Sequence, residues 1–284
     1  MEIGAHISTA GGIDKSIPRA SDIGCEAIQI FGSSPQSWRF SMPSETQTNS
    51  MKEMAPEHGI RSIFFHAVYL INLATNKQEN LIKGITSLIN YMELAKIVGA
   101  TAVVFHPGSH RGSGYNTVSK QLITSIQKVV ESSPDGPFLA IENTAGMGQH
   151  IGADFKELGQ IIKSVGSPKV KMCLDTQHSY AAGYNVRTRD GVDSLVEELD
   201  REIGSSNIVV VHANDSKKPL GSGVDRHENI GQGHIGIEGF ENIMSNPFFQ
   251  NIPFILEVPG LDGKGPDKHN IDTLKGIRKN IGVT

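Results

Sequence analysis

The sequence predicts an α/β protein that folds as a single-domain (β/α)₈ TIM barrel. Two patterns support this: short apolar runs typical of strands recur eight times, and longer amphipathic stretches separate most of them. The length of 284 residues also lies within the range of one such barrel. An open, doubly wound sheet is the structural alternative, but that fold has no need of eight strand-and-helix units. We therefore expect residues 1–284 to form one catalytic domain.

The expected strands are short runs rich in β-branched and aromatic residues. They occupy residues 3–5, 27–31, 62–65, 102–105, 138–141, 170–174, 208–211 and 253–256. Seven of these eight runs lead directly into a histidine, a glutamate or an aspartate. The carboxyl ends of the strands all lie on one face of a parallel barrel, so these ionisable side chains should converge there.

The expected helices lie between the strands. Residues 81–98 carry apolar side chains at helical spacing, and Gly99 is placed where a glycine commonly ends a helix. Similar patterns occupy residues 118–130, 155–165 and 192–203, and shorter ones occupy 238–244 and 271–281.

Composition indicates a globular cytoplasmic protein. The first twenty residues lack a secretory signal pattern, and no apolar run is long enough to span a membrane. Cys25 and Cys173 are too few for a disulfide framework, so we expect two buried thiols in a reducing compartment. The formal net charge of −4 argues against a nucleic-acid partner, unless bound cations reverse its sign locally.

A ring of ionisable side chains at one rim would be unstable without cations, because partly buried charges need partners. The ligand candidates are five histidines and four carboxylates: His66, His106, Glu142, Asp175, His178, His212, Asp225, His227 and Glu257. Imidazole mixed with carboxylate favours zinc, or else manganese or iron, over magnesium and calcium. Nine donors exceed the needs of one tetrahedral ion and suit two or three ions that share a carboxylate. Asp175 and His178, three residues apart just past a strand end, could serve two neighbouring metals.

Several long motifs follow one another in order: GAHIS, FHAVYLINLAT, FHPGS, IENTAG, CLDTQHSYAAGY, HANDSKKPLGSGVDRHENIGQGHIG and ILEVPG. Together they cover nearly the whole chain, and they resemble the endonuclease IV family of apurinic/apyrimidinic endonucleases. The resemblance implies a (β/α)₈ barrel that carries three zinc ions at its carboxyl-terminal face, with manganese as an alternative metal.

The resemblance also implies how the nine candidates are shared among the ions. His66, His106 and Glu142 would hold the first zinc, and Glu142 would bridge to the second. Asp175, His212 and Glu257 would complete the second site. His178, Asp225 and His227 would hold the third.

The implied activity is base excision repair on double-stranded DNA that contains abasic sites. The family hydrolyses the phosphodiester 5′ to the abasic site, leaving a 3′-hydroxyl and a 5′-deoxyribose phosphate, and it also trims blocked 3′ ends. Metal-bound hydroxide would be the nucleophile, with Glu142 as the bridging carboxylate. No obligate protein partner or membrane is implied, so we expect a monomer.

Two loops correspond to DNA contacts of the family. Tyr69 and Leu70 match the side chains that fill the gap left at the flipped abasic nucleotide, although packing into the core would also explain them. In the other loop, Gln36 stands where relatives often carry an arginine, and Trp38 and Arg39 follow it. Arg226 is a further candidate for a phosphate contact.

The main alternative is a sugar isomerase or epimerase of the xylose isomerase-like barrels. Such an enzyme would use Glu142, Asp175, His212 and Glu257 around one divalent ion and would leave the other five candidates without a role. A catalytically silent DNA-binding barrel is a third hypothesis. The segment 231–236 fits G-x-G-x-x-G, but it does not directly follow a strand, so we do not expect dinucleotide binding. We expect His6 to lie behind the ligands without binding metal.

Overall fold

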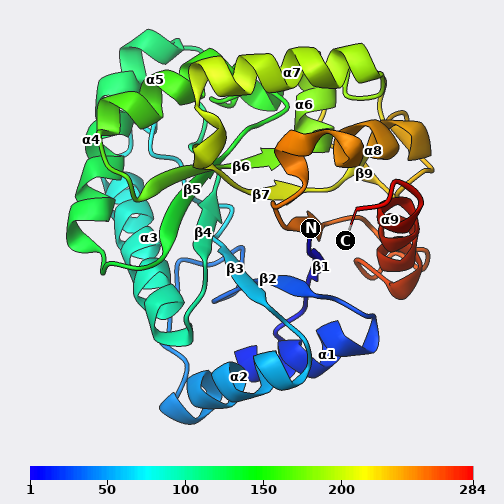
Figure 1. The fold of residues 1–284 in the computed structure, drawn as a ribbon. Coiled ribbons are helices and arrows are strands. Elements are labelled where there is room, and N and C mark those ends of the chain that lie inside the picture. Colours follow the sequence, from blue (N-terminus) through cyan, green and yellow to red (C-terminus); the bar gives the residue numbers. More distant parts are fainter. Residues whose placement is uncertain (284) are drawn as a thin grey trace.

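The computed structural model describes residues 1–283, in which a closed parallel barrel is surrounded by helices (Figure 1). The barrel strands run in the order β1-β10-β7-β6-β5-β4-β3-β2. Their bounds are β1 Ile3–His6, β2 Ala27–Phe31, β3 Ser62–His66, β4 Ala102–Phe105, β5 Phe138–Glu142, β6 Val170–Asp175, β7 Ile208–His212 and β10 Phe254–Leu256. All eight correspond to the expected strands, so the predicted barrel is confirmed. Two short strands, β8 (Asp215–Ser216) and β9 (His227–Glu228), pair as an antiparallel hairpin outside it.

The helices have the bounds α1 Ser16–Asp22, α2 Glu45–Glu57, α3 Gln78–Val98, α4 Tyr115–Ser132, α5 Phe155–Val165, α6 Thr176–Ala182, α7 Arg189–Glu202, α8 Gly236–Ser245 and α9 Lys268–Asn280. All six helices expected from the sequence are present, and each agrees within three residues at either end. Helices α1, α2 and α6 were not predicted. In α2 the pattern is weak because only Thr48, Met51 and Ala55 are buried.

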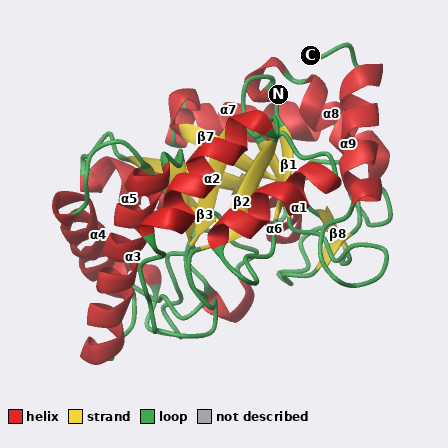
Figure 2. Ribbon diagram, turned by 90° about the horizontal axis from the view of Figure 1, so that it is seen from below, coloured by secondary structure: helices red, strands yellow, loops and turns green. Residues whose placement is uncertain are grey.

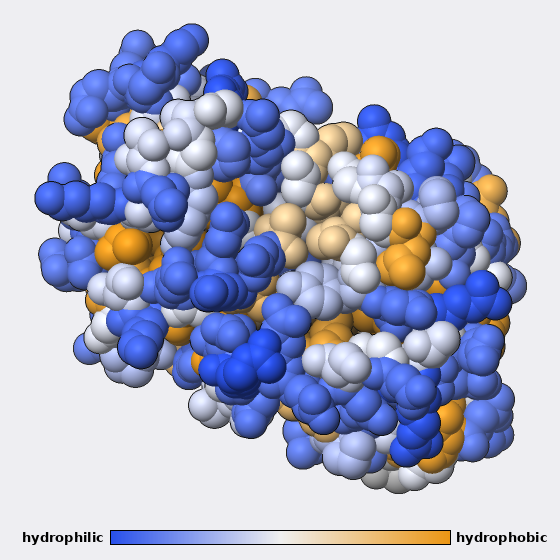
Figure 3. Space-filling model, turned by 90° about the horizontal axis from the view of Figure 1, so that it is seen from above, coloured by the Kyte–Doolittle hydropathy of each residue, from blue (hydrophilic) through white to orange (hydrophobic). Residues whose placement is uncertain are grey.

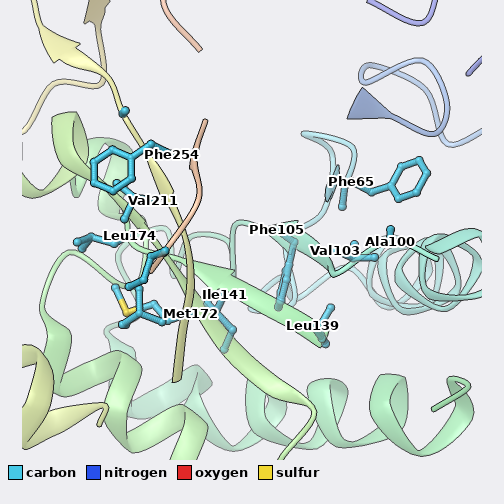
Figure 4. Packing of buried hydrophobic residues seen from close by; sticks show 14 of the residues in the cluster. Phe65, Ala100, Val103, Phe105, Leu139, Ile141, Met172, Leu174, Val211 and Phe254 are labelled. Atoms are coloured by element: carbon cyan, nitrogen blue, oxygen red, sulfur yellow. The ribbon is translucent and has the colours of Figure 1, made fainter. Parts of the chain in front are cut away.

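Alternation along the strands divides the apolar residues into two layers, because successive side chains point to opposite faces. Inside the barrel is a plug of mostly small side chains: Ala27, Phe64, Ala102, Val104, Ala140, Cys173, Val210 and Ile255. The intervening residues pack outward against the helices. Figure 4 shows part of this outer layer, where Phe105, Ile141 and Leu174 project from neighbouring strands. The plug fills the barrel, so polar chemistry is confined to its ends.

At the amino-terminal end of the barrel, a half-buried glutamate forms ion pairs with arginine and lysine side chains. Glu26, just before β2, accepts two hydrogen bonds from the Arg278 guanidinium, at 2.6 and 2.9 Å. Lys275 Nζ lies 3.3 Å from the same carboxylate, and the backbone N–H of Ile3 donates to it at 3.0 Å. These contacts tie α9 to β1 and β2. They hold the pKa of Glu26 at about 2, although burial acts to raise it.

The longer loops gather at the opposite, carboxyl-terminal end of the strands, which we call the rim. In Figure 2 they extend along the lower edge, away from both chain termini. The side of the molecule shown in Figure 3 is mostly hydrophilic, with hydrophobic atoms in small separate groups. Within residues 1–283, no helix is both long and apolar enough to cross a membrane.

Candidate metal centre

The barrel strands bring the predicted ligands together at the rim. His66, Glu142, Asp175 and His212 are the last residues of β3, β5, β6 and β7, so the strands present them at one end of the barrel. His106 and Glu257 directly follow β4 and β10.

Glu142 is fully buried at the middle of the cluster. Its Oε2 lies 3.1 Å from His66 Nε2 and 3.3 Å from His106 Nε2, while its Oε1 lies 3.1 Å from His212 Nδ1. The two oxygens thus face two different groups of donors. This is the arrangement that a carboxylate shared by two ions requires.

The donor atoms form overlapping groups in which all members lie within 4.8 Å of one another. One group is His66, His106 and Glu142. A second, which we call the quartet, is Glu142, Asp175, His212 and Glu257. A third is Asp175, His178 and His227. Asp175 therefore adjoins two groups, as Glu142 does, which agrees with the expectation that Asp175 and His178 could serve neighbouring metals.

Asp225 completes the third group from the loop side. One of its oxygens lies 3.4 Å from His178 Nε2, and the other lies 3.4 Å from His227 Nε2. His178 sits in the first turn of α6, whose N-cap is Asp175: the Asp175 carboxylate accepts the backbone N–H of His178 at 2.8 Å. One aspartate thus caps a helix and faces the cluster at the same time.

The hairpin that carries His227 is fixed by a buried carboxylate. Asp215 pairs with Glu228 across the hairpin and accepts backbone N–H groups of the loop 231–236, including those of Gly231 at 2.9 Å and Ile235 at 2.9 Å. A side chain at Gly233 would place its Cβ 2.5 Å from Asp215 Oδ1, so only glycine fits there. The G-x-G-x-x-G segment therefore wraps a carboxylate of its own chain.

Three of the histidines are oriented by backbone carbonyls. His66 Nδ1–H donates to Ala67 O at 2.8 Å, and His178 Nδ1–H donates to Asn143 O at 2.9 Å. His227 Nδ1 lies 3.3 Å from Glu257 O. A carbonyl can only accept, so Nδ1 of each ring carries a proton, and Nε2 is the nitrogen that faces the cluster and could bind a metal ion.

Two buried asparagines that were not identified from the sequence hold Asp175 in place. Asn143 accepts the backbone N–H of Asp175 at 2.7 Å. Asn214 Nδ2 donates to Asp175 Oδ2 at 2.7 Å, and Asn214 Oδ1 accepts the backbone N–H of Glu257 at 2.8 Å. Both residues closely follow a candidate ligand, in the motifs IENTAG and HANDS. That proximity is the signal that could have revealed them.

The electrostatics of the rim depend on histidines. Within residues 1–283, every ion pair of the four candidate carboxylates is with a histidine. Burial opposes ionisation of Glu142, but its interactions with the surrounding histidines, including hydrogen bonds from His178 and His212, outweigh burial and hold its pKa well below the usual range. Burial raises the pKa of Asp175 and lowers that of His106 to about 4.

The residues fit a set of divalent cations. Among the described residues, His227 Nε2 is buried and without a hydrogen-bond partner, although carboxylate oxygens of Asp225 and Asp175 lie 3.4 and 3.8 Å away. A buried nitrogen that faces two carboxylates is suited to bind a metal ion. The mixture of imidazole and carboxylate donors also favours divalent transition metals. This structure supports divalent metal binding at the rim.

A cavity of about 490 Å³ opens above the donors and is lined by His106, Asp225 and Glu257, with Tyr69 on its wall. Tyr69 is also part of the wall of a second cavity, of about 440 Å³, which Trp38 and Arg111 line.

The predicted DNA-contact residues lie on loops around these cavities. Tyr69 is 61% exposed and Leu70 38% exposed, so packing into the core does not explain them. The backbone N–H of Tyr69 donates to Pro35 O at 3.0 Å and thereby joins the two predicted contact loops. Gln36, Arg39 and Arg226 are exposed, whereas Trp38 is half-buried.

The remaining histidines do not join the cluster. His6 Nδ1 lies 3.3 Å from Glu257 Oε1; His6 lines the cavity beside the ligands but belongs to none of the donor groups found among residues 1–283. His58, His110, His150, His234 and His269 belong to none of the donor groups found among residues 1–283. Cys25 and Cys173 are both free and buried, as predicted, but Cys173 also forms a donor group with Glu142 and His212, which the spacing of the cysteines did not indicate.

Comparison with known proteins gives a consistent picture. A family model described as xylose isomerase-like TIM barrel matches residues 17–280. The chain is 38% identical over 276 residues to a probable endonuclease 4 of Halothermothrix orenii, covering 97% of this chain and 99% of that protein. It is 36% identical to a probable endonuclease 4 of Geobacter sulfurreducens, with coverage of 97% and 94%.

Solved structures agree with these relatives. Endonuclease IV from Thermus thermophilus superposes with a TM-score of 0.87 at 34% identity, covering 99% of this chain and 100% of that one. A D-tagatose 3-epimerase-like protein superposes with a TM-score of 0.74 at 20% identity, covering 99% and 97%. At that identity, the second likeness concerns the fold alone.

Proposed function

The chain belongs to the endonuclease IV family of xylose isomerase-like TIM barrels, and we propose that it repairs DNA by hydrolysing the phosphodiester 5′ to abasic sites. The products are a 3′-hydroxyl and a 5′-deoxyribose phosphate. Blocked 3′ ends are a second substrate of the same site. The protein is accordingly a DNA-cleaving enzyme, and its substrate is double-stranded DNA.

One observation carries this proposal: the rim holds more donors than a one-metal isomerase needs. The quartet alone would satisfy such an enzyme. The five additional candidates converge on the same cavity, and Tyr69 and Leu70 project from a loop beside it. Hydrolysis of a phosphodiester requires that the phosphate, the leaving group and the nucleophile all be bound. The additional donors could hold the further metal ions that this requires.

We propose that three zinc ions occupy the rim, with manganese as an alternative. His66, His106 and Glu142 would hold the first, the quartet the second, and His178, Asp225 and His227 the third. When bound, such ions offset the charge of the phosphodiester and lower the pKa of a coordinated water to about 7.

The side chains of the protein then have distinct tasks. Glu142 is a fully buried carboxylate whose oxygens face two donor groups, so it would hold two ions side by side when they are bound. Tyr69 and Leu70 are suited to fill the space of the missing base, which holds the abasic sugar away from the stack. The phenol of a tyrosine titrates at about pH 10, so the Tyr69 ring would enter DNA uncharged at neutral pH.

The outer loops would meet the sugar-phosphate backbone. Arg39 and Arg226 are exposed cations there, while Gln36 offers an uncharged amide and Trp38 a flat apolar surface. We further propose a cytoplasmic monomer with no obligate protein partner and no membrane association. The free thiols of Cys25 and Cys173 suit a reducing compartment.

The test is cleavage of a labelled duplex that contains one abasic-site analogue. The protein is assayed with zinc, with chelator, and as the variant His227→Ala. We expect incision on the 5′ side, lost on chelation and strongly reduced in the variant. The labelled product should end in a 3′-hydroxyl that a DNA polymerase can extend.

A protein that holds metal but leaves this duplex intact would contradict the proposal. Keto-sugars would then be the next substrates to assay, because the quartet is sufficient for one-metal isomerisation. If neither substrate reacts but the duplex is bound, the silent DNA-binding hypothesis would remain.

A further inference from the structure

Gln29 is a fully buried polar residue in the middle of strand β2. Its neighbours Ile28 and Ile30 belong to the outer apolar layer, whereas Ala27 belongs to the inner plug. Alternation along the strand therefore directs Gln29 into the barrel, one step closer to the rim than Ala27. A polar side chain in this position needs hydrogen-bond partners inside the barrel.

The partners of Gln29 are two members of the quartet. Gln29 Nε2 donates to Glu257 Oε1 at 2.7 Å, and Gln29 Oε1 lies 2.9 Å from His212 Nε2. Gln29 Nε2 also lies 3.1 Å from His6 Nδ1. In the closed barrel, β2 and β7 are separated by β1 and β10. The amide thus reaches across two strands, and His6 and Glu257 project from the ends of those strands beside it.

These contacts fix the protonation of His212 step by step. The Glu257 carboxylate can only accept hydrogen bonds, so the NH₂ group of Gln29 faces it and the amide oxygen faces His212. That oxygen can also only accept, so His212 Nε2 carries the proton. Nδ1 is therefore the His212 nitrogen that can release its proton to bind a metal ion, and it lies 3.1 Å from Glu142 Oε1 and 3.2 Å from Glu257 Oε2.

His212 differs in this respect from the other oriented histidines of the cluster. His66, His178 and His227 turn Nδ1 toward a backbone carbonyl and face the cluster with Nε2. His212 uses the opposite nitrogen, so its proton-bearing side points into the barrel interior. Gln29 supplies the acceptor there.

We infer that Gln29 is a positioning residue for the quartet: it orients Glu257 and holds His212 in the tautomer that presents Nδ1 to a metal ion. This inference rests on the proposed metal-dependent function and assigns a role within its second subsite. Partners that orient metal ligands typically change metal affinity by about 10- to 100-fold when removed. We expect an effect of that size, confined to one metal equivalent.

Two variants separate the two halves of the contact. Gln29→Met keeps the approximate length of the side chain and removes both hydrogen bonds. Gln29→Glu keeps an acceptor for His212 but brings a carboxylate against Glu257. As a matched control, Gln121→Met removes an amide that donates to the carbonyls of Leu73 and Thr75, away from all donor groups.

The experiment measures two properties of the zinc-loaded proteins. The first is metal content per chain after equilibration with graded EDTA, and the second is the imidazole ¹⁵N spectrum, which reports the tautomer of each histidine. For Gln29→Met we expect one metal equivalent to be lost at an EDTA concentration about 10- to 100-fold lower than for the parent protein. We also expect a mixture of the two tautomers at His212. Gln29→Glu should lose the same equivalent while His212 keeps its proton on Nε2. The control should match the parent protein.

The inference is overturned if Gln29→Met loses its metal at the same EDTA concentrations as the parent protein and His212 keeps a single tautomer. A lower unfolding temperature of metal-free Gln29→Met, without selective metal loss, would likewise assign Gln29 to packing alone. Should Gln29→Met fail to fold, Gln29→Glu decides the matter by the same two measurements. Neither measurement involves DNA, so an absence of incision by the parent protein would overturn the proposed substrate and leave this result standing.

Discussion

The amino-terminal end of the barrel surrounds Glu26 with Arg278, Lys275 and Arg61, whereas the rim surrounds four carboxylates with histidines. At the first end, the cations belong to the chain and are always charged. At the rim, a histidine can offset a carboxylate only by taking up a proton, which a bound metal ion would displace. At the amino-terminal end, the side chains of the protein therefore balance the carboxylate by themselves. The carboxylates of the rim are suited to bind cations from solution.

The difference predicts that equivalent substitutions at the two ends will fail in different ways. A change to a glutamate at the rim should affect the reaction, and a change to a glutamate at the amino-terminal end should affect the fold. Four substitutions or conditions test this contrast, from the largest expected effect to the smallest.

Glu142→Gln removes the charge of the carboxylate that joins two donor groups. We expect kcat for abasic-site incision to fall by about 10²- to 10³-fold, because charge stabilisation at the reacting phosphate is lost. Metal content should fall as well. Steady-state kinetics on a duplex substrate, with metal analysis of the same preparation, measure both effects.

The matched control for this variant is Glu26→Gln at the opposite end. It should leave kcat per folded molecule unchanged. If Glu26→Gln lost incision while Glu142→Gln retained it, the assignment of chemistry to the rim would be wrong.

Acid should reveal the contribution of Glu26 to stability. Its pKa is about 2 in the folded protein and about 4.5 when free, so the folded state favours the ionised form. The stabilisation is complete above pH 4.5 and is lost as pH falls from 4.5 toward 2. It amounts to at most roughly 3 kcal/mol, because solvent screens part of the interaction between the charges.

The measurement is the free energy of unfolding of metal-free protein in urea between pH 7 and pH 3, for the parent and for Glu26→Gln. The parent should be more stable at pH 7, and the gap should narrow as pH falls below 4.5. A gap that stays constant with pH would mean that the ion pair with Arg278 does not stabilise the fold.

Much of this architecture could be predicted from the sequence because the relevant signals are local. The run Val103-Val104-Phe105 followed by His106 predicts both a strand and a functional side chain at its end. Repeated around a barrel, such strand ends predict a shared site without any long-range information. The same reasoning located most of the nine candidate ligands, and the spacing of nearby histidines and aspartates supplied the others.

Other features depend on contacts that the sequence does not display. Glu26 and Arg278 are 252 residues apart, so nothing near either one predicts their pairing. Helix α2 lacks an apolar stripe, and its one local signal is the capping box between Ser44 and Gln47. Gln29 was visible as a single polar residue in an apolar strand, but its partners are defined only when the barrel closes.

Tyr69→Ala tests whether the rim recognises damage by filling space in DNA. The side chain is 61% exposed, so its removal should cost little stability. Loss of one stacking contact is worth about 1–3 kcal/mol, so we expect roughly 10-fold weaker binding of abasic duplex. Fluorescence anisotropy should show little change for an undamaged duplex. Equal weakening for both duplexes would indicate a general backbone contact in place of a damage-specific one.

Gln36→Arg is expected to have the smallest effect and to act in the opposite direction. Gln36 is exposed on the loop that also carries Arg39. An added cation at a phosphate should tighten DNA binding several-fold at low salt. The slope of log K against log salt should steepen by about 0.9 for one new phosphate contact. A change in affinity without a change in slope would place position 36 beside a base or sugar, because only a phosphate contact releases a counterion when it forms.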